Sequence, residues 1–294
     1  MSAGASAWRQ VRATVLQQRP YGAGHFWLDL DVPTGFVAPV PGQFAQLLLP
    51  PATGPAFLPR PMSVAGVTRR GRQLTVGFLY AAVGPGTQAL AMLRPGDLVE
   101  VLGPLGRGFP LERPGTPLLI AGGRGVAPLL FAAAQLALHG RRVELLFGAR
   151  DREHLVGMAE ASRLLKRFGG RLHECTDDGS RGLRGNVIQL LERVVTKLGS
   201  LGSNVVLHAC GPHAMLKAAA RWAMQHDREA WLAMESVMAC GTGVCRGCPL
   251  PRSASGQQAF PSAAPSLLGN RDYAMCCTEG PVFESRSLDW ARVH

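Results

Sequence analysis

The chain has 294 residues, of which 47% are hydrophobic and 17% charged; this excludes a disordered protein and favours two or three compact units. Its formal charge of +11 comes from 28 arginines and three lysines, but these are scattered without any run of five basic residues, which argues against nucleic-acid binding. No secretory signal opens the chain, and the most apolar window, 117–138, contains Arg124, three glycines and two prolines, so we expect a cytoplasmic protein without a membrane span.

The first part, residues 1–112, carries short β-rich runs that are separated by glycine and proline turns. Six runs at this spacing predict an antiparallel β-barrel or a sandwich. One short helix is expected over 87–93, before the last run. The runs lie at 11–16, 25–32, 42–49, 62–67, 73–80 and 97–103.

Two segments of this first part are candidates for binding a flavin dinucleotide. In Arg60-Pro61-Met62-Ser63, the arginine fork suits a pyrophosphate and the serine can reach a flavin edge, although an ordinary strand entry would look the same. In Gly84-Pro85-Gly86-Thr87, a glycine turn opens a helix, and its backbone amides can surround an anion. Since the two segments lie in one barrel, we predict that FAD spans them.

The second part, residues 113–233, alternates between strand and helix patterns. This alternation predicts a doubly wound parallel sheet, which binds its ligand at the carboxyl ends of the strands. The predicted strands cover 117–123, 142–150, 171–178, 204–210 and 229–235, and the predicted helices cover 127–140, 154–168, 186–198 and 213–226.

Two strand ends of this sheet are candidates for binding a nicotinamide dinucleotide. "IAGGRGVAPLL" places Gly122, Gly123 and Gly125 between a strand and a helix, where glycines let the backbone approach a phosphate. The strict Gly-x-Gly-x-x-Gly spacing is absent. Cys210 and Gly211 end the fourth strand, where a nicotinamide would meet a flavin, although a small buried cysteine explains Cys210 equally well.

The last part, residues 234–294, is rich in cysteine and poor in core residues, so a metal centre would stabilise it. Cys240, Cys245 and Cys248 have the Cys-x4-Cys-x2-Cys spacing of plant-type ferredoxins, which suits a 2Fe–2S cluster. Zinc is the alternative, but it is usually bound by two Cys-x2-Cys pairs. Cys276 and Cys277 compete as the fourth ligand, because neighbours in an extended segment point in opposite directions.

Taken in register, these motifs resemble the electron-transfer subunits of the NAD-dependent, two-subunit dihydroorotate dehydrogenases (type B) of the ferredoxin reductase superfamily. The resemblance implies that Arg60–Ser63 is an FAD motif, that Leu79, Tyr80 and Ala81 contact the flavin, and that Gly86 and Thr87 form a phosphate turn. It places the last cluster ligand at Cys277, before "TEGPVF". Further matching segments are "GPLGRGF" (103–109), "GGRGVAPL" (122–129), "DDGSRGLRGNV" (177–187) and "CGPHAML" (210–216).

The resemblance also implies a function in pyrimidine biosynthesis. Electrons would pass between NAD(H), FAD and the 2Fe–2S cluster, to or from an FMN-containing catalytic subunit, in a heterotetramer. Hydride transfer needs no acid–base pair, so no catalytic side chain is assigned. Two alternatives remain: the reductase subunit of another multi-subunit oxidoreductase, of the hydrogenase or glutamate synthase type, and a zinc-stabilised scaffold without enzymatic activity.

Three features depart from the family pattern. A Pro/Ser/Ala-rich stretch (249–267) lengthens the interval between Cys248 and Cys277. Arg124 stands in the nicotinamide loop, where it can grip a pyrophosphate or obstruct it. "ARDRE" (149–153) follows the second strand, where arginines favour a 2′-phosphate and an aspartate favours a free 2′-hydroxyl, so the choice between NADH and NADPH is open.

Overall fold

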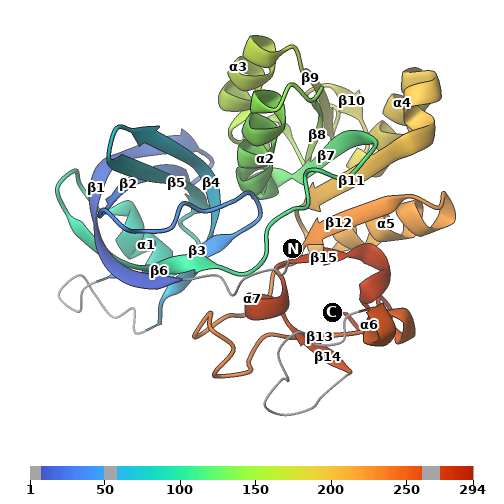
Figure 1. Ribbon diagram of the computed structural model, residues 1–294. Coiled ribbons are helices and arrows are strands. Elements are labelled where there is room, and N and C mark those ends of the chain that lie inside the picture. Colours follow the sequence, from blue (N-terminus) through green and yellow to red (C-terminus); the bar gives the residue numbers. More distant parts are fainter. Residues whose placement is uncertain (1–7, 50–57, 260–271, 294) are drawn as a thin grey trace.

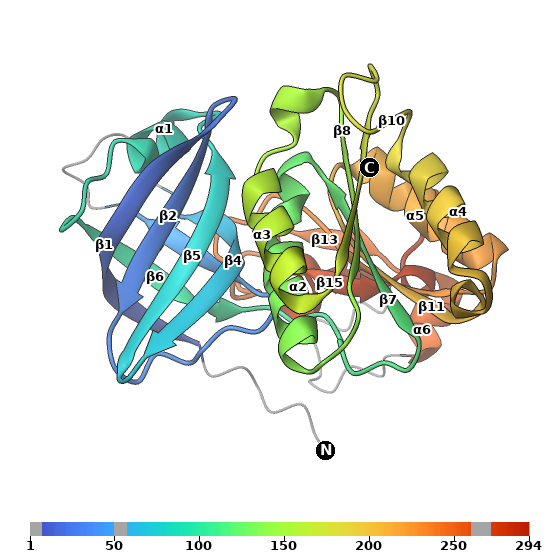
Figure 2. The same ribbon diagram turned by 90° about the horizontal axis from the view of Figure 1, so that it is seen from above.

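The first six strands form a closed antiparallel barrel in the computed structural model, which describes residues 8–49, 58–259 and 272–293. The strand order β1-β2-β5-β4-β3-β6 confirms the predicted barrel rather than the sandwich (Figure 2). Closure pairs every strand on both sides, so no edge is left free. The strands are β1 (Arg9–Gly22), β2 (His25–Val32), β3 (Phe44–Leu48), β4 (Arg60–Arg70), β5 (Gln73–Ala81) and β6 (Leu98–Leu105).

The barrel has a core of its own, in which Leu28, Leu30 and Phe78 are fully buried. The expected helix is α1 (Pro85–Ala91), which begins two residues earlier than predicted. It follows an extended Gly84 and has proline at its first position, where the missing N–H costs no hydrogen bond.

The second unit is the predicted doubly wound parallel sheet. Its strand order is β10-β9-β8-β7-β11-β12-β15, in which all pairs are parallel except the last. Helices α2 and α3 cover one face, and α4 and α5 cover the other (Figure 2). The strands are β7 (Thr116–Gly122), β8 (Glu144–Ala149), β9 (Arg171–Thr176), β10 (Leu183–Arg184), β11 (Val205–Cys210) and β12 (Glu229–Ala233). The helices are α2 (Val126–Leu138), α3 (Met158–Phe168), α4 (Val187–Leu198) and α5 (His213–Gln225).

Local sequence signals fix the ends of these helices. Asn186 caps α4, because its side chain accepts hydrogen bonds from the amides of Ile188 and Gln189. Helix α3 ends at Gly169, which has a left-handed conformation. No helix within the described ranges is both long and apolar enough to cross a bilayer.

The C-terminal segment adds to the α/β sheet and also contacts the barrel (Figure 1). Its strand β15 pairs antiparallel with β12, so residues on both sides of position 233 belong to one sheet. Phe283, Leu288 and Trp290 share a hydrophobic core with the sheet. Residues 260–267 of the Pro/Ser/Ala-rich stretch, and 268–271 after it, lie outside the described residues. The remaining elements are β13 (Pro249–Pro251), α6 (Ala254–Ala259), β14 (Tyr273–Met275), α7 (Cys276–Glu279) and β15 (Val282–Glu284).

Candidate functional site

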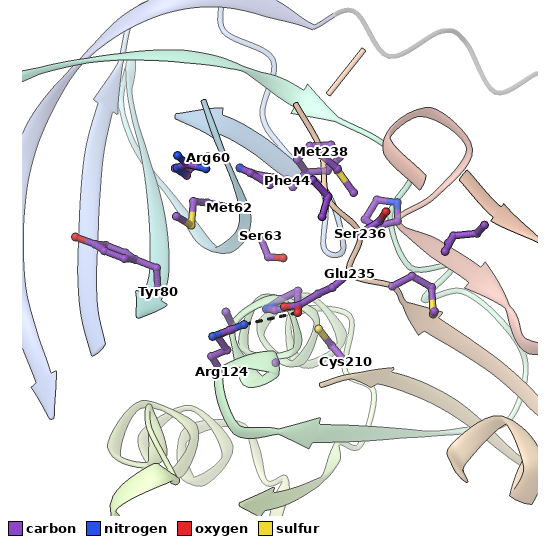
Figure 3. A pocket seen from close by; sticks show the side chains of 18 of the residues that line it. Phe44, Arg60, Met62, Ser63, Tyr80, Arg124, Cys210, Glu235, Ser236 and Met238 are labelled. Atoms are coloured by element: carbon purple, nitrogen blue, oxygen red, sulfur yellow. Dashed lines mark ion pairs between the residues drawn. The ribbon is translucent and has the colours of Figure 1, made fainter. Parts of the chain in front are cut away.

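A cavity of about 1030 Å³ lies where the barrel, the α/β sheet and the C-terminal segment meet. Side chains from β4 and β5 line its barrel side (Figure 3). The two segments that we predicted to bind FAD therefore reach one cavity. The predicted flavin residues on its wall are Arg60, Pro61, Met62, Ser63, Leu79, Tyr80, Ala81 and Thr87.

Gly86, the predicted phosphate-turn glycine, lies against the Arg60 side chain. A Cβ atom at position 86 would be 2.4 Å from Arg60 Nε, so only glycine leaves room for the guanidinium. Within the described residues this buried Nε has no hydrogen-bond partner. A buried N–H without an acceptor costs free energy, so an anionic group in the cavity would stabilise the arrangement.

Thr87 organises the turn before α1. Its hydroxyl oxygen accepts hydrogen bonds from the amides of Val83 at 2.9 Å and Gly84 at 3.1 Å, and the hydroxyl donates to the Gly84 carbonyl. We expected this turn to offer its amides to an anion. One of them, the Gly84 amide, is instead used within the turn, and Arg60 supplies a charged anion-binding group on the same side.

Tyr80 forms a fixed aromatic wall of the first cavity. Its hydroxyl accepts a hydrogen bond of 2.6 Å from Gln18 Nε2, and its ring stacks on Phe26 with centroids 5.9 Å apart. Burial raises the pKa of Tyr80 to about 12, although the hydrogen bond from Gln18 opposes the rise. Tyr80 therefore stays neutral at physiological pH.

A second cavity, of about 750 Å³, lies at the carboxyl ends of β7, β8, β9 and β11. This is where a doubly wound sheet binds a dinucleotide. Gly122, Gly123, Gly125 and Gly211 line it, and Cys210 lines the adjoining first cavity. Burial raises the pKa of the Cys210 thiol, so this group remains neutral.

Three of these glycines are needed for packing between neighbouring strand ends. A Cβ atom at Gly211 would be 2.9 Å from the Gly122 Cα, and one at Gly125 would be 2.7 Å from the Gly211 Cα. Gly123 differs, because its φ of +51° favours glycine and a Cβ there would meet nothing within 4 Å. We expected Gly122, Gly123 and Gly125 to let the backbone approach a phosphate. For Gly122 and Gly125 the packing of the strand ends is a second reason for glycine.

Arg124 and Glu235 form part of the wall between the two cavities. Both side chains line both cavities, and Arg124 Nη2 is ion-paired with Glu235 Oε2 at 3.7 Å (Figure 3). The pair is partly exposed, so it contributes little stability and can open at small cost. Groups bound in the two cavities can therefore approach one another here.

His25 is a cavity residue that the sequence analysis missed. It is buried and lines the second cavity with Ala23 and Gly24. Its Nδ1 is 2.9 Å from the Ala23 carbonyl oxygen. The alternating pattern located the hairpin, but it carried no information that the hairpin tip reaches the α/β sheet.

The predicted cluster cysteines form two pairs. The Cys245 amide donates to the Cys240 sulfur at 3.4 Å, and the Cys277 amide donates to the Cys248 sulfur at 3.4 Å. The side chains within each pair are also hydrogen-bonded to one another. Cys240 interacts electrostatically with both Cys248 and Cys277, so the two pairs are neighbours.

The surroundings of two of these sulfurs favour the thiolate form, which is the form that binds metals. Burial opposes ionisation of Cys240, but hydrogen bonds from Cys245 and Thr242 outweigh it and lower the pKa of Cys240 to about 6. The Cys277 side chain and amide donate to Cys248 and lower the pKa of Cys248 to about 6. The same hydrogen bond raises the pKa of the donor, Cys277.

The paired arrangement bears on the kind of metal centre. Across 8–49, 58–259 and 272–293, no group of three or more His, Cys, Asp or Glu side chains is placed to hold a metal ion. A structural zinc ion needs four ligands around one point. A 2Fe–2S cluster needs four thiolates, two for each iron. Two cysteine pairs suit either centre, so the Cys-x4-Cys-x2-Cys spacing remains the observation that favours the cluster.

Cys276, the other candidate for the fourth ligand, is directed elsewhere. Its buried thiol donates to the Met234 carbonyl at 3.6 Å. The segment is a helical turn, α7, and not the extended strand that we assumed in separating Cys276 from Cys277. The Cys277 amide donates to the Cys248 sulfur, whereas Cys276 reaches Cys248 only through its backbone amide and directs its thiol to Met234.

The cysteine loop packs against the mouth of the barrel. Gln46 Nε2 donates to the Met238 carbonyl at 3.3 Å. Gly241 has a φ of +74°, and a Cβ there would be 2.8 Å from Gln46 Cγ. The first cavity extends to Gly247, which precedes Cys248. The cysteines are therefore adjacent to the cavity of the predicted flavin site.

Comparisons with known proteins identify the α/β sheet as a nucleotide-binding domain and find relatives that match nearly the whole chain. Residues 119–221 match the family described as Oxidoreductase NAD-binding domain. The dihydroorotate dehydrogenase B (NAD(+)) electron transfer subunit of Desulforamulus reducens is 32% identical over 266 residues, which cover 90% of this chain and 92% of the relative. The same subunit of Geobacillus sp. WCH70 is 33% identical over 283 residues, covering 94% and 97%. The chain belongs to this family of electron transfer subunits.

The fold of this family member is also similar to those of solved structures. An NADH-dependent reduced ferredoxin–NADP oxidoreductase, studied for flavin-based electron bifurcation, has a TM-score of 0.75 at 25% identity. The match covers 96% of this chain and 91% of that chain. A cytochrome P450 reductase from Amycolatopsis has a TM-score of 0.60 at 26% identity, covering 75% and 67%. The longer match includes the C-terminal segment as well as the barrel and the sheet.

In this electron transfer subunit the segment after β12 also contributes to the first cavity. Met234, Glu235, Ser236, Val237 and Met238 line it, and they connect the α/β sheet to Cys240. No site residue was predicted in this segment, because helical and strand periodicity ends at Glu235. The only signal in the sequence was that these five residues lie between the last predicted strand and the cysteine motif.

Proposed function

We propose that this chain is the electron-transfer subunit of a dihydroorotate dehydrogenase and conducts electrons between a nicotinamide dinucleotide and an FMN-containing catalytic subunit. The observation that carries the proposal is the continuity of three sites. The dinucleotide cavity shares a wall with the barrel cavity, and the barrel cavity reaches the cysteine loop. The relatives that match over the whole chain bear the corresponding name.

FAD fits the first cavity by the chemistry of the residues on its wall. Arg60 offers a buried donor to the pyrophosphate, Ser63 offers a hydroxyl, and Tyr80 is a rigid neutral wall. Cys210 and Glu235 lie at the end that adjoins the dinucleotide cavity. Bound FAD would accept a hydride and release single electrons, which a 2Fe–2S cluster can carry onward.

A 2Fe–2S cluster fits the cysteine pairs Cys240–Cys245 and Cys248–Cys277. Backbone amides donate to the sulfurs of Cys240 and Cys248, and such hydrogen bonds stabilise the thiolates and raise the potential of a cluster. We propose that the surrounding tail, 234–294, is a small cluster-binding domain; its described residues, 234–259 and 272–293, form only short strands and helices. Metal binding would supply part of its folding free energy.

The face beside the cysteine loop suits the catalytic subunit as a partner. Val237 and Val244 are 84% and 83% exposed, and Cys245 is exposed between Val244 and Arg246. Isolated apolar side chains are common on surfaces, but these two lie three residues before Cys240 and directly before Cys245. We propose that the catalytic subunit covers this face in a heterotetramer.

Visible spectroscopy tests the proposed cofactors. Protein purified anaerobically should show flavin bands together with a broad iron–sulfur shoulder. Both should bleach on titration with NADH or NADPH. A colourless protein that contains one equivalent of zinc would contradict the proposal and favour the scaffold alternative.

Changing Cys245→Ser tests the ligand assignment. We expect loss of the iron–sulfur absorbance with flavin still bound, because Cys245 does not line the flavin cavity. Cys276→Ser is the matched control, since its thiol faces Met234, and it should keep the cluster spectrum. An unchanged cluster spectrum in Cys245→Ser would show that the pairing is assigned incorrectly.

A further inference from the structure

The hairpin between β1 and β2 carries a buried histidine to the wall of the second cavity. Its loop is Ala23-Gly24, and both residues have positive φ angles, +47° and +70°, as a tight two-residue hairpin turn requires. His25 follows directly and begins β2. All three residues line the cavity, and His25 is only 9% exposed. The barrel therefore places an imidazole against a site that lies mainly at the strand ends of the α/β sheet.

The end of β5 fixes this hairpin tip. The Ala82 amide donates to the Gly24 carbonyl at 2.9 Å, and His25 is directly opposite Ala81 in the register of β2 and β5. The Cβ atoms of opposite residues in an antiparallel pair lie about 5 Å apart. Ala81 lines both cavities, so the imidazole lies beside the boundary where a nicotinamide would meet the flavin.

The hydrogen bond of the His25 ring determines its tautomer. Nδ1 lies 2.9 Å from the Ala23 carbonyl oxygen, which can only accept, so Nδ1 carries the proton. Burial lowers the pKa of His25, although hydrogen bonds to backbone carbonyls oppose the change. At neutral pH the ring is therefore uncharged, and its Nε2 is an acceptor. The backbone partners of the ring, the carbonyls of Ala23 and Gly22, offer Nε2 no donor.

Two donor side chains on the cavity wall act electrostatically on His25, and both are engaged elsewhere. Arg124 is ion-paired with Glu235. The His154 ring is held by Asp151 at 2.6 Å. Resting on the proposed function, we propose that Nε2 of His25 accepts a hydrogen bond from the nicotinamide half of a bound dinucleotide and so positions this half beside the flavin. The matching donors on the ligand are the carboxamide N–H and the ribose hydroxyls.

Calorimetric titration of the oxidised full-length holoprotein tests the proposal with three probes. NAD⁺ carries both kinds of donor, 3-acetylpyridine adenine dinucleotide has a methyl group in place of the carboxamide NH₂, and 5′-AMP lacks the nicotinamide half. We expect His25→Leu to bind NAD⁺ about five- to tenfold more weakly, as the loss of one hydrogen bond implies, and to bind 5′-AMP as the wild type does. His25→Gln should bind NAD⁺ within about twofold of the wild type, because its amide oxygen can replace Nε2 as the acceptor.

His139→Leu is the matched control. His139 also contacts a backbone carbonyl through Nδ1, which is 2.8 Å from the Gln135 oxygen. It is exposed at the end of α2 and lines neither cavity, so its replacement should leave the affinity for all three probes unchanged.

The analogue identifies the donor. If the carboxamide is the donor, His25→Leu weakens the binding of NAD⁺ but not that of the acetylpyridine analogue. If a ribose hydroxyl is the donor, both dinucleotides lose affinity equally. Either result supports the proposal.

Three results would overturn it and leave the electron-transfer function intact: unchanged NAD⁺ binding in His25→Leu, an equal loss of 5′-AMP binding in that variant, or His25→Gln binding NAD⁺ as weakly as His25→Leu. The second of these would show that the substitution disturbs the whole cavity. A wild-type protein that binds none of the three probes would overturn the dinucleotide site itself and the proposed function with it.

Discussion

A buried imidazole in the central sheet makes the fold sensitive to mild acid. His208 on β11 is 1% exposed, and Phe109 packs on its edge with ring centroids 5.6 Å apart. Burial lowers the pKa of His208 to about 4. In the unfolded chain the pKa of a histidine is about 6.5, so the unfolded state binds a proton first as the pH falls. Folding stability is therefore complete above pH 6.5 and decreases toward pH 4.

We expect His208→Leu to remove this acid sensitivity, because leucine has a similar volume and does not titrate. From the two pKa values, the wild-type free energy of unfolding should fall by about 2 kcal/mol more than that of the variant between pH 7 and pH 5. Urea unfolding at both pH values measures the difference. Parallel losses in the two proteins would show that His208 is not the titrating group.

Site residues could be predicted from the sequence wherever a short motif carries the chemistry. The structural reason for each residue was harder to predict. The spacing of Cys240, Cys245 and Cys248 pointed to a cluster, and the structure pairs Cys245 with Cys240 and Cys277 with Cys248. Gly122 and Gly125 were predicted to let the backbone approach a phosphate, yet they also allow two strand ends to pack. His25 was missed because its role depends on a contact between separate domains.

At the scale of elements, an ion pair connects the two arms of the cysteine tail. Arg252, directly after β13, is ion-paired with Glu279 at the end of α7, and Glu279 Oε1 also accepts the Met275 amide at 2.9 Å. The Arg252 side chain is only 8% exposed. The pair therefore helps to hold the segment after Cys248 close to the turn that carries Cys277.

Removing this contact should loosen the tail. We expect Arg252→Met to lower the free energy of unfolding by about 1–3 kcal/mol, because Glu279 loses its partner in a largely buried place. Cluster release to an iron chelator should become several-fold faster. Arg286→Met is the control: its partner Asp227 is 94% exposed, so the loss should stay below about 1 kcal/mol. Equal release rates in both variants would contradict a specific role of Arg252.

Helices and strands could be predicted from the sequence where the hydrophobic pattern repeats within the segment itself. All six barrel runs and all four long helices of the sheet domain appear in the structure, because their patterns repeat over many residues. The three-residue strand β15 was not foreseen, since its existence depends on the distant edge of β12. The helical turn α7 was taken as extended for the same reason: its conformation depends on contacts outside the segment.

At the scale of the whole molecule, the barrel, the α/β sheet and the tail meet around the first cavity. The first cavity takes lining residues from all three, and Gln46 of the barrel is hydrogen-bonded to the Met238 carbonyl of the tail. Gly241 allows this approach, because a side chain there would collide with Gln46 and Leu105. The Gly241 contact, together with the bridge between Arg107 and Pro281, thus helps to set the position of the cysteines relative to the flavin cavity.

Gly241→Ala should disturb this contact. The φ of +74° costs alanine about 1–3 kcal/mol, and its Cβ would lie 2.8 Å from Gln46 Cγ, so the loop must move from the barrel. Gly71→Ala separates the two effects, because Gly71 has a φ of +59° and open space around it. Both variants should lose stability in thermal unfolding. Only Gly241→Ala should slow the bleaching of cluster absorbance after rapid mixing with reduced dinucleotide, while flavin bleaching stays at the wild-type rate. If Gly71→Ala slows cluster bleaching equally, backbone strain alone is responsible, and the contact with the barrel does not set the transfer rate.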